Sequence, residues 1–253
     1  MPEFSANLGF LYTEFSLPDA IRAAAEDGFD AVECHWPYMV PAGTIKQVLS
    51  DTGLTMLGLN TVRGKTAENG LAALVGRQVE ARAAIDQAIE YAAAIGALNV
   101  HVMAGITRGG AATDCFVENL QYACAKAAPL GITILIEPLN DGDAPGYFLQ
   151  YSAQAQVIIE RVGSGNLKLM FDCYHLQIME GNLLDSLEKL MPIIGHIQIA
   201  SVPDRAEPDH GNLDYKQIVN KIETLRYTQP IGAEYKPATT TRAGLGWLRG
   251  YQN

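Results

Sequence analysis

The sequence predicts a (β/α)8 TIM barrel, and three observations support this fold class. Short apolar or β-branched runs alternate with longer segments of helical composition, which is typical of parallel strands joined by crossover helices. Eight such runs can be recognised, and 253 residues is close to the usual length of a barrel of this kind. The first run is not followed by the glycine-rich turn that an open, doubly wound sheet usually carries. We therefore expect one catalytic barrel domain over residues 1–253.

The expected elements follow one another in regular order along the chain. Glycines separate several helix ends from the next apolar run, as in EDGFDAVE and APLGITILIE. Strands are expected at 5–11, 29–34, 55–60, 99–103, 133–137, 168–172, 195–199 and 230–234. Helices are expected at 17–27, 76–95, 114–129, 152–162, 182–191 and 214–225, with a closing helix in GLGWLRGY. Longer loops at 62–74 and 140–151 follow the third and fifth strands, where barrel enzymes keep active-site loops.

Composition and charge narrow the class of protein. Hydrophobic residues make up 48% of the chain, which fits a globular protein with a substantial core. The net charge of -10 argues against a nucleic-acid or membrane-surface partner, because phosphate groups attract basic surfaces. The four cysteines form no CxxC pair, so we expect free thiols in a reducing compartment. No signal-peptide pattern and no membrane-length apolar run is evident, so a cytoplasmic protein is expected.

Four oxygen-bearing side chains fall at the ends of the last four expected strands. They are Glu137 in ITILIEP, Asp172 in LKLMFDCYH, Gln198 in HIQIAS and Glu234 in GAEYKP. A lone acid at a strand end is more often a helix N-cap or a solvated turn residue. Four such side chains at successive strand ends would instead meet at one rim of a barrel. Carboxylate and amide oxygens are the ligands that Mg²⁺ and Mn²⁺ prefer, so the pattern predicts a divalent metal site.

Several longer motifs carry a resemblance to a known family. They are ANLGFLYTE, GFDAVECHWPY, GLAALVGR, VHVMAG, IEPLN, DCYHLQIMEGNL, HIQIASVPDRAEPDHGNLDY and GAEYKP, which together run nearly end to end. The chain resembles the hydroxypyruvate isomerase family, a branch of the xylose isomerase-like TIM barrels. The motifs IEPLN, PGYFL and QIMEGNL lean toward the 2-oxo-tetronate isomerases of that family. Two segments, CHWPY and IASVPD, depart from the commoner FLFPY and IAGLPD, and both are expected to flank the pocket.

The resemblance implies an intramolecular isomerase that depends on a divalent metal, Mg²⁺ or Mn²⁺. Its substrate would be a short hydroxy-keto acid, converted from hydroxypyruvate to tartronate semialdehyde or from a 2-oxo-tetronate to its 3-oxo isomer. Such a reaction passes through an enediolate, whose negative charge a bound cation stabilises. The resemblance assigns Glu137 and Glu234 to proton exchange as acid and base. Together with Asp172 and Gln198, they would also bind the metal.

An anionic sugar-acid substrate requires positively charged or hydrogen-bonding side chains near the metal. The candidates are His175, Arg205 and Lys236. Arginine suits a carboxylate because two of its N–H groups can bond both oxygens at once. His175 lies one helical turn past the acid of the sixth strand. An exposed ion pair with Asp204 or Glu207 is the alternative interpretation of Arg205.

Three further polar residues fall within the expected strands. Glu33 ends the second strand and is expected to line the floor of the pocket or to pair with a base. His196 should point the same way as Gln198 but deeper, because Ile197 separates the two along one strand. His101 lies within the fourth strand, where a core position and a pocket position are both compatible with the sequence.

Other functions remain open at this point. A metal-dependent epimerase or dehydratase of sugars or polyols could use the same ligands on the same barrel. A DNA-repair endonuclease of similar fold would need a histidine-rich zinc site and a basic groove, against which the five histidines and the net charge of -10 argue. A non-catalytic sugar-acid binding protein would leave the two acid/base carboxylates unexplained. A homo-oligomer is compatible with the fold, although no interface pattern is evident.

Overall fold

The computed structural model describes residues 1–252, and in this part of the chain nine parallel strands form one sheet. Along the sheet the order is β3-β2-β1-β9-β8-β7-β6-β5-β4. The strands are β1 (Phe4–Asn7), β2 (Ala31–Glu33), β3 (Thr55–Met56), β4 (Gly58–Asn60), β5 (Asn99–His101), β6 (Thr133–Ile136), β7 (Leu167–Asp172), β8 (Ile194–Ile199) and β9 (Ile231–Ala233).

The two ends of this sheet meet in a single stretch of chain, which closes the barrel. The strands β3 and β4 are separated only by Leu57, and β3 pairs with β2 while β4 pairs with β5. The Leu57 backbone N–H donates to the Val32 carbonyl at 2.7 Å, and the Cys34 N–H donates to the Gly58 carbonyl at 3.0 Å. The barrel prediction is therefore confirmed, and the segment predicted as one strand at 55–60 accounts for two of the nine.

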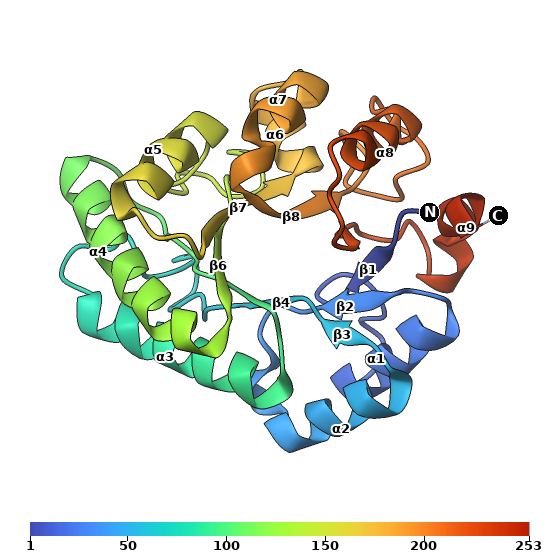
Figure 1. Cartoon of the computed structure of the whole chain (residues 1–253), viewed down its shortest axis with the longest axis horizontal. Helices are drawn as coiled ribbons and strands as arrows, with labels where there is room; N and C mark the ends of the chain where they lie inside the picture. The colour runs from blue at the N-terminus through green and yellow to red at the C-terminus, as the bar shows by residue number, and fades with distance from the viewer. Residues whose placement is uncertain (253) are drawn as a thin grey trace.

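Helices surround the ring of strands on its outer side, as Figure 1 shows. They are α1 (Leu17–Glu26), α2 (Ala42–Thr52), α3 (Gln78–Ile95), α4 (Gly110–Ala127), α5 (Ser152–Val162), α6 (Cys173–Met179), α7 (Leu183–Leu190), α8 (Tyr215–Thr224) and α9 (Gly246–Gln252). Short 3-10 turns occur at η1 (Pro37–Met39), η2 (Ala128–Leu130), η3 (Met191–Ile193) and η4 (Arg242–Gly244).

The helix boundaries follow from local chemistry that the sequence displays. Asp214 begins α8, because its carboxylate accepts from the backbone N–H groups of Lys216 and Gln217. The helices α2, α3 and α5 each end at a glycine with positive φ, a conformation that is costly for residues with a Cβ. The helices predicted at 17–27, 76–95, 152–162, 182–191 and 214–225 are confirmed within two residues at each end. The helix α4 begins at Gly110, earlier than predicted.

Two helices were not given bounds by the sequence. The helix α2 follows a proline-rich segment, PYMVP, which obscures its start. The short α6 follows β7 directly, with Asp172 as its N-cap, so that strand and helix lie within one apolar run. The structure also confirms that all four cysteines are free and buried. Within residues 1–252, no helix is both long enough and apolar enough to cross a membrane.

Successive side chains of β8 point alternately into the barrel interior and toward the helices outside. His196 and Gln198 both bond Glu33 inside the barrel, so Ile197 between them faces the opposite side. The Ile197 side chain is fully buried in the main hydrophobic cluster. It therefore stabilises the strand without contributing to the barrel interior.

Replacing Ile197 with alanine is expected to lower the free energy of unfolding by about 2–5 kcal/mol, because it leaves a cavity in a packed layer. The milder Ile197→Val should cost about 0.5–1.5 kcal/mol. Urea unfolding of the three proteins measures both values. Equal stabilities for the alanine and valine variants would contradict the packing described for this side chain.

Candidate metal and active site

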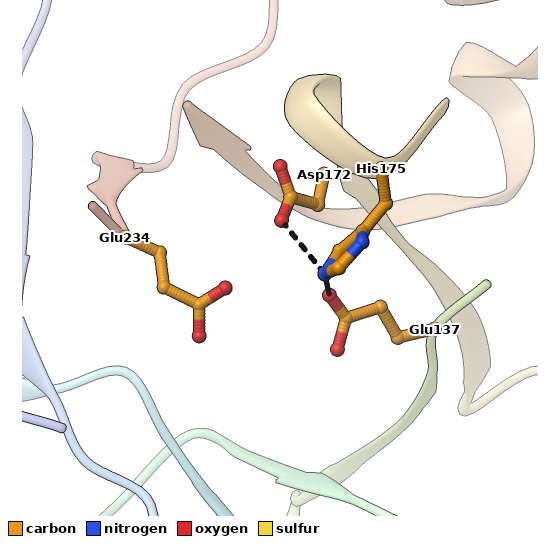
Figure 2. Close-up of side chains that lie close together, drawn as sticks. All are labelled: Glu137, Asp172, His175 and Glu234. Atoms are coloured by element: carbon orange, nitrogen blue, oxygen red, sulfur yellow. Dashed lines mark ion pairs between the residues drawn. The ribbon is translucent and has the colours of Figure 1, made fainter. Parts of the chain in front are cut away.

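Three carboxylates and a histidine converge at the rim formed by the carboxyl ends of the strands. Glu137 directly follows β6, Asp172 ends β7, His175 lies on α6, and Glu234 directly follows β9. One potential ligand atom from each lies within 4.8 Å of the others, and all four residues are buried. Figure 2 shows the three carboxylates facing one another across a common space, with the imidazole beside Glu137 and Asp172.

Gln198 belongs to the same rim. It lies opposite Asp172 in the register between β7 and β8, and it is buried. Within the described residues, three buried oxygens have no hydrogen-bond partner: Glu137 Oε1, Asp172 Oδ2 and Gln198 Oε1. Buried oxygens without partners are costly, and a cation held at this rim would compensate those within its reach. The donor set consists of hard oxygens and therefore fits a divalent ion such as Mg²⁺ or Mn²⁺.

Asp172 combines a structural role with its place in this cluster. Its Oδ1 accepts from the Tyr174 backbone N–H at 2.8 Å and so begins α6. Within residues 1–252, its Oδ2 accepts no hydrogen bond and faces the cluster, 3.5 Å from His175 Nε2 and 3.6 Å from the Arg205 guanidinium. The sequence allowed two roles for an acid at a strand end, a helix cap and a site residue. Asp172 has both roles, because Oδ1 caps the helix and Oδ2 faces the cluster.

Arg205 supplies the positive charge among these acids. Its guanidinium lies 2.7 Å from Glu234, 3.1 Å from Asp143 and 3.6 Å from Asp172. The guanidinium carbon also lies 4.8 Å from the ring centre of Phe10, which favours a cation–π contact. The side chain is only 8% exposed. Arg205 therefore faces the pocket.

The alternative of an exposed ion pair for Arg205 is wrong. Asp204 instead pairs with His210 at 2.9 Å and accepts from the Ser201 hydroxyl. Glu207 accepts from the backbone N–H of Ala238 at 3.1 Å. Both acids have other partners, because the loop turns sharply at Arg205, whose φ is +55°.

Burial and mutual repulsion raise the pKa values of the clustered acids, whereas Arg205 lowers them. Burial raises the pKa of Glu137 well above its ordinary value, and the neighbouring Glu234 and Asp172 raise it further. Burial also raises the pKa of Asp172, to about 7, although Arg205 acts against it. At Glu234, burial would raise the pKa, but Arg205 and the His35 hydrogen bond outweigh it and lower the pKa to about 2. Without a further cation, these acids cannot all be ionised easily.

His175 is held in one tautomer by the loop beside it. Its Nδ1 accepts from the Asn140 backbone N–H at 3.1 Å and lies 2.7 Å from the Asn140 side-chain nitrogen. Burial lowers the pKa of His175 to about 3, so the ring is neutral at pH 7 and carries its proton on Nε2. This Nε2–H faces Asp172 at 3.5 Å and Glu137 at 3.9 Å. His175 is therefore a hydrogen-bond donor here, without a free lone pair for a cation.

A pocket opens above the carboxylates and encloses about 520 Å³ of empty space, including its mouth. Its lining includes the predicted residues Glu137, Glu234, His175 and Arg205. Lys236 lies outside this lining: its side chain is exposed, and its ammonium is 5.9 Å from the Phe10 ring. The structure thus brings six of the seven predicted site residues together around the rim and leaves Lys236 at the edge.

Several residues around the pocket were not predicted. Asn7 and His35 both bond Glu234 Oε1, at 2.9 Å and 3.1 Å. Arg63 stacks on the Trp36 ring at 4.2 Å, and both line the pocket. The unusual CHWPY segment, which supplies His35 and Trp36, was the available signal. A Cβ at Gly9 would lie 2.1 Å from the His35 ring, so the glycine there is required for the approach.

The interior below the cluster holds the remaining polar strand residues. Glu33 bonds His196 at 3.1 Å and Gln198 at 2.8 Å, which confirms the pairing predicted for it. His101 is buried, with its Nδ1 3.5 Å from Glu137 Oε2, and burial lowers its pKa to about 4. Its two ring nitrogens have no hydrogen-bond partner in the described part of the chain.

Comparison with known proteins identifies the family to which the chain belongs. The model of the xylose isomerase-like TIM barrel family matches residues 21–251. The 2-oxo-tetronate isomerase of Cupriavidus necator is 46% identical over 257 residues, which cover 99% of each chain. The hydroxypyruvate isomerase of Escherichia coli is 38% identical over 258 residues, which cover 100% of each chain. The resemblance inferred from the sequence motifs is therefore confirmed.

A solved structure shares the fold closely. It is the crystal structure of an AP endonuclease, family 2, from Brucella melitensis, with a TM-score of 0.96 and 41% sequence identity. The match covers 99% of both chains. The barrel and its loops thus follow an experimentally known course along nearly the whole chain.

The tautomer of His175 can be tested directly by NMR. Long-range ¹H–¹⁵N correlation spectra of ¹⁵N-labelled, metal-free protein at pH 7 should show a protonated Nε2 and an unprotonated Nδ1, because two Asn140 donors point at Nδ1. The exposed His210, whose ring nitrogens face two aspartates, provides a contrasting spectrum in the same sample. A proton on Nδ1 of His175 would overturn this assignment and restore it as a possible metal ligand.

Proposed function

The chain belongs to the xylose isomerase-like TIM barrel family, and we propose that it is a metal-dependent isomerase of a short hydroxy-keto acid. The curated relatives that match it over its full length are isomerases, and it is accordingly an enzyme of the isomerase class. One structural observation supports the proposed metal dependence. Glu137 and Asp172, which cluster with Glu234, each have a buried oxygen without a partner among the described residues, and Gln198, opposite Asp172 on the neighbouring strand, has a third.

These four residues would hold the cation. Glu137, Asp172 and Glu234 present carboxylate oxygens within 4.8 Å of one another, and Gln198 lies opposite Asp172 on the neighbouring strand. When bound, a divalent cation would stabilise negative charge developing on the substrate oxygens. Mg²⁺ and Mn²⁺ both accept oxygen ligands of this kind.

Glu137 and Glu234 are proposed to move the proton. Isomerisation takes a proton from the hydroxyl-bearing carbon and delivers one to the former carbonyl carbon. A second proton passes from the hydroxyl oxygen to the former carbonyl oxygen, so atoms and charge are conserved. The two glutamates follow β6 and β9, which lie on either side of β7 and β8 in the sheet. They therefore approach the shared space from different directions, as Figure 2 shows. A substrate between them would have a carboxylate on each side.

Arg205 and His175 are proposed to hold the substrate. Both line the pocket above the carboxylates, next to Glu137 and Glu234. Arg205 offers a fork of N–H groups that matches a carboxylate, and His175 offers its Nε2–H. Such a substrate would be hydroxypyruvate or a 2-oxo-tetronate, which are the substrates in the relatives' names. Lys236, at the edge, remains a weaker candidate for the same role.

Two alternative functions compete with the proposed isomerase: a metal-dependent epimerase or dehydratase, and an endonuclease. An epimerase or dehydratase could use the same ligands, but a dehydratase would change the mass of its substrate. The Brucella melitensis structure is described as an endonuclease. The candidate metal cluster found in residues 1–252 contains one histidine, and the net charge is -10, which argues against a nucleic-acid substrate here.

Removing either proposed acid/base group should nearly abolish turnover. The variants Glu137→Gln and Glu234→Gln are expected to lose about 10²- to 10⁴-fold in kcat, because an amide cannot exchange the proton. Proton NMR in D₂O, with Mn²⁺ or Mg²⁺ present, would follow hydroxypyruvate and 2-oxo-tetronates and report deuterium uptake next to the carbonyl. The matched control is Glu207→Gln, a buried carboxylate outside the cluster, which should retain activity.

The same assay separates the competing functions. A product with the carbonyl on the neighbouring carbon and one hydrogen replaced by deuterium supports isomerisation. A stereoisomer with its carbonyl unmoved indicates an epimerase, and loss of water indicates a dehydratase. Full activity in both glutamine variants would remove the proposed roles of these residues. An absence of turnover on every short hydroxy-keto acid tested would remove the proposed substrate class.

Cation binding should stabilise the fold, because it compensates buried oxygens at this rim. At a Mn²⁺ concentration 100 times the dissociation constant, the free energy of unfolding should rise by about 2.7 kcal/mol. Urea unfolding with Mn²⁺ and with EDTA measures this difference. Asp172→Asn should lose most of the increase, while Asp204→Asn, at an acid bound to His210, should keep it. Equal stability with Mn²⁺ and with EDTA would count against a metal site.

A further inference from the structure

Gln198 can serve a cation in only one of its two amide orientations. The amide carries an oxygen, which can bind a cation, and an NH₂ group, which cannot. In the structure the NH₂ group donates to Glu33 Oε2 at 2.8 Å, and the oxygen is buried without a partner in the described part of the chain. A rotation of the amide by about 180° would place the NH₂ group among the carboxylates instead. Something must therefore select the productive orientation.

Glu33 is placed to make this selection. It is 4% exposed and lies at the end of β2, on the far side of β1 and β9 from Gln198. Its Oε1 accepts from the Ser5 hydroxyl at 3.1 Å, and its Oε2 lies 3.1 Å from His196 Nε2. Because Glu33 Oε2 accepts from the Gln198 NH₂ group, this carboxylate favours the amide orientation in which the Gln198 oxygen lies away from it.

A glycine keeps the path between these two side chains open. Gly232 lies on β9, in register with Gln198 on β8. A Cβ at this position would lie 2.2 Å from Glu33 Oε1 and 2.8 Å from Gln198 Cγ. These distances are far inside van der Waals contact, so a larger residue would push the carboxylate away. Neither left-handed backbone geometry nor a turn requires this glycine, which leaves the close approach of Glu33, Gln198 and His196 as its reason.

We propose that Glu33 is a positioning residue that turns the Gln198 oxygen toward the metal site, and that Gly232 is retained to let it do so. Glu33 does not face the cation itself; it acts through the amide. Supporting residues of this kind typically contribute about 10- to 100-fold to metal affinity. The inference rests on the proposed metal site, and the experiment below tests the two separately.

The experiment titrates Mn²⁺ into metal-free protein and measures the dissociation constant by calorimetry. Glu33→Met and Glu33→Gln both remove the negative charge, but only the methionine removes the acceptor oxygen for Gln198. The methionine variant should bind Mn²⁺ at least about tenfold more weakly than the glutamine variant. Glu33→Gln is therefore the matched control for charge, and it is expected to keep most of the affinity.

A second pair of variants leaves Glu33 itself in place. In Gly232→Ala the new methyl group should displace the Glu33 carboxylate, with a loss of about tenfold in Mn²⁺ affinity. Gly58→Ala is the matched control, since it also adds a methyl group within a barrel strand. Its Cβ would meet only ordinary contacts, the nearest at 3.6 Å to Asn99. Because the Gly232→Ala methyl would also lie 2.8 Å from Gln198 Cγ, this pair tests the crowding at Gly232. If Glu33→Met does not fold, Glu33→Leu replaces it in the comparison with Glu33→Gln.

The outcomes separate the inference from the proposed function. If the unmodified protein binds no Mn²⁺, the metal site fails. If it binds Mn²⁺ but Glu33→Met and Glu33→Gln weaken binding equally, charge accounts for the effect and the positioning role is wrong. Unchanged affinity in Gly232→Ala would likewise overturn the role given to that glycine. A purely structural role of Glu33 would lower the metal-free melting temperature and leave the dissociation constant unchanged.

Discussion

The structure depends on how three buried carboxylates share one small space. Glu137, Asp172 and Glu234 lie within reach of a single ion, and burying such charges without compensation is strongly unfavourable. The guanidinium of Arg205 offsets part of this charge, since it contacts Glu234 and Asp172. It does not reach the unpartnered oxygen of Glu137, whose pKa remains raised by burial and by the other two acids. The surplus of negative charge is what makes the site receptive to a cation.

The sequence predicted those parts of the site that parallel strands place by themselves. A strand end recurs once per βα unit, and the carboxyl ends of parallel strands meet at one rim. The shared rim of Glu137, Asp172, Gln198 and Glu234 therefore followed from their spacing in the sequence. The short helix after β7 likewise brought His175 to the rim.

Residues placed by loops or by contacts across the barrel could not be predicted in the same way. His35 reaches Glu234 across 199 positions of sequence, and Arg205 depends on a turn with positive φ. Lys236 is the opposite case, a residue that the sequence placed in the site and that lies at its edge in the structure. It lies two residues past Glu234, but its side chain turns outward while its backbone N–H bonds the Arg205 carbonyl at 2.7 Å. Periodicity describes strands well and says little about where a loop directs a side chain.

Under the proposed function, the position of Arg205 links metal binding to substrate binding. The guanidinium now bonds Glu234 at 2.7 Å, and Glu234 is also one of the four proposed metal ligands. A divalent cation held by the same acids would offset their charge more fully than a single guanidinium does. The contact of Arg205 with Glu234 would then stabilise the site less, and its N–H fork would be available for the carboxylate of a substrate. Because the phenyl ring of Phe10 packs against the guanidinium, the arginine would remain in the pocket during this exchange of partners.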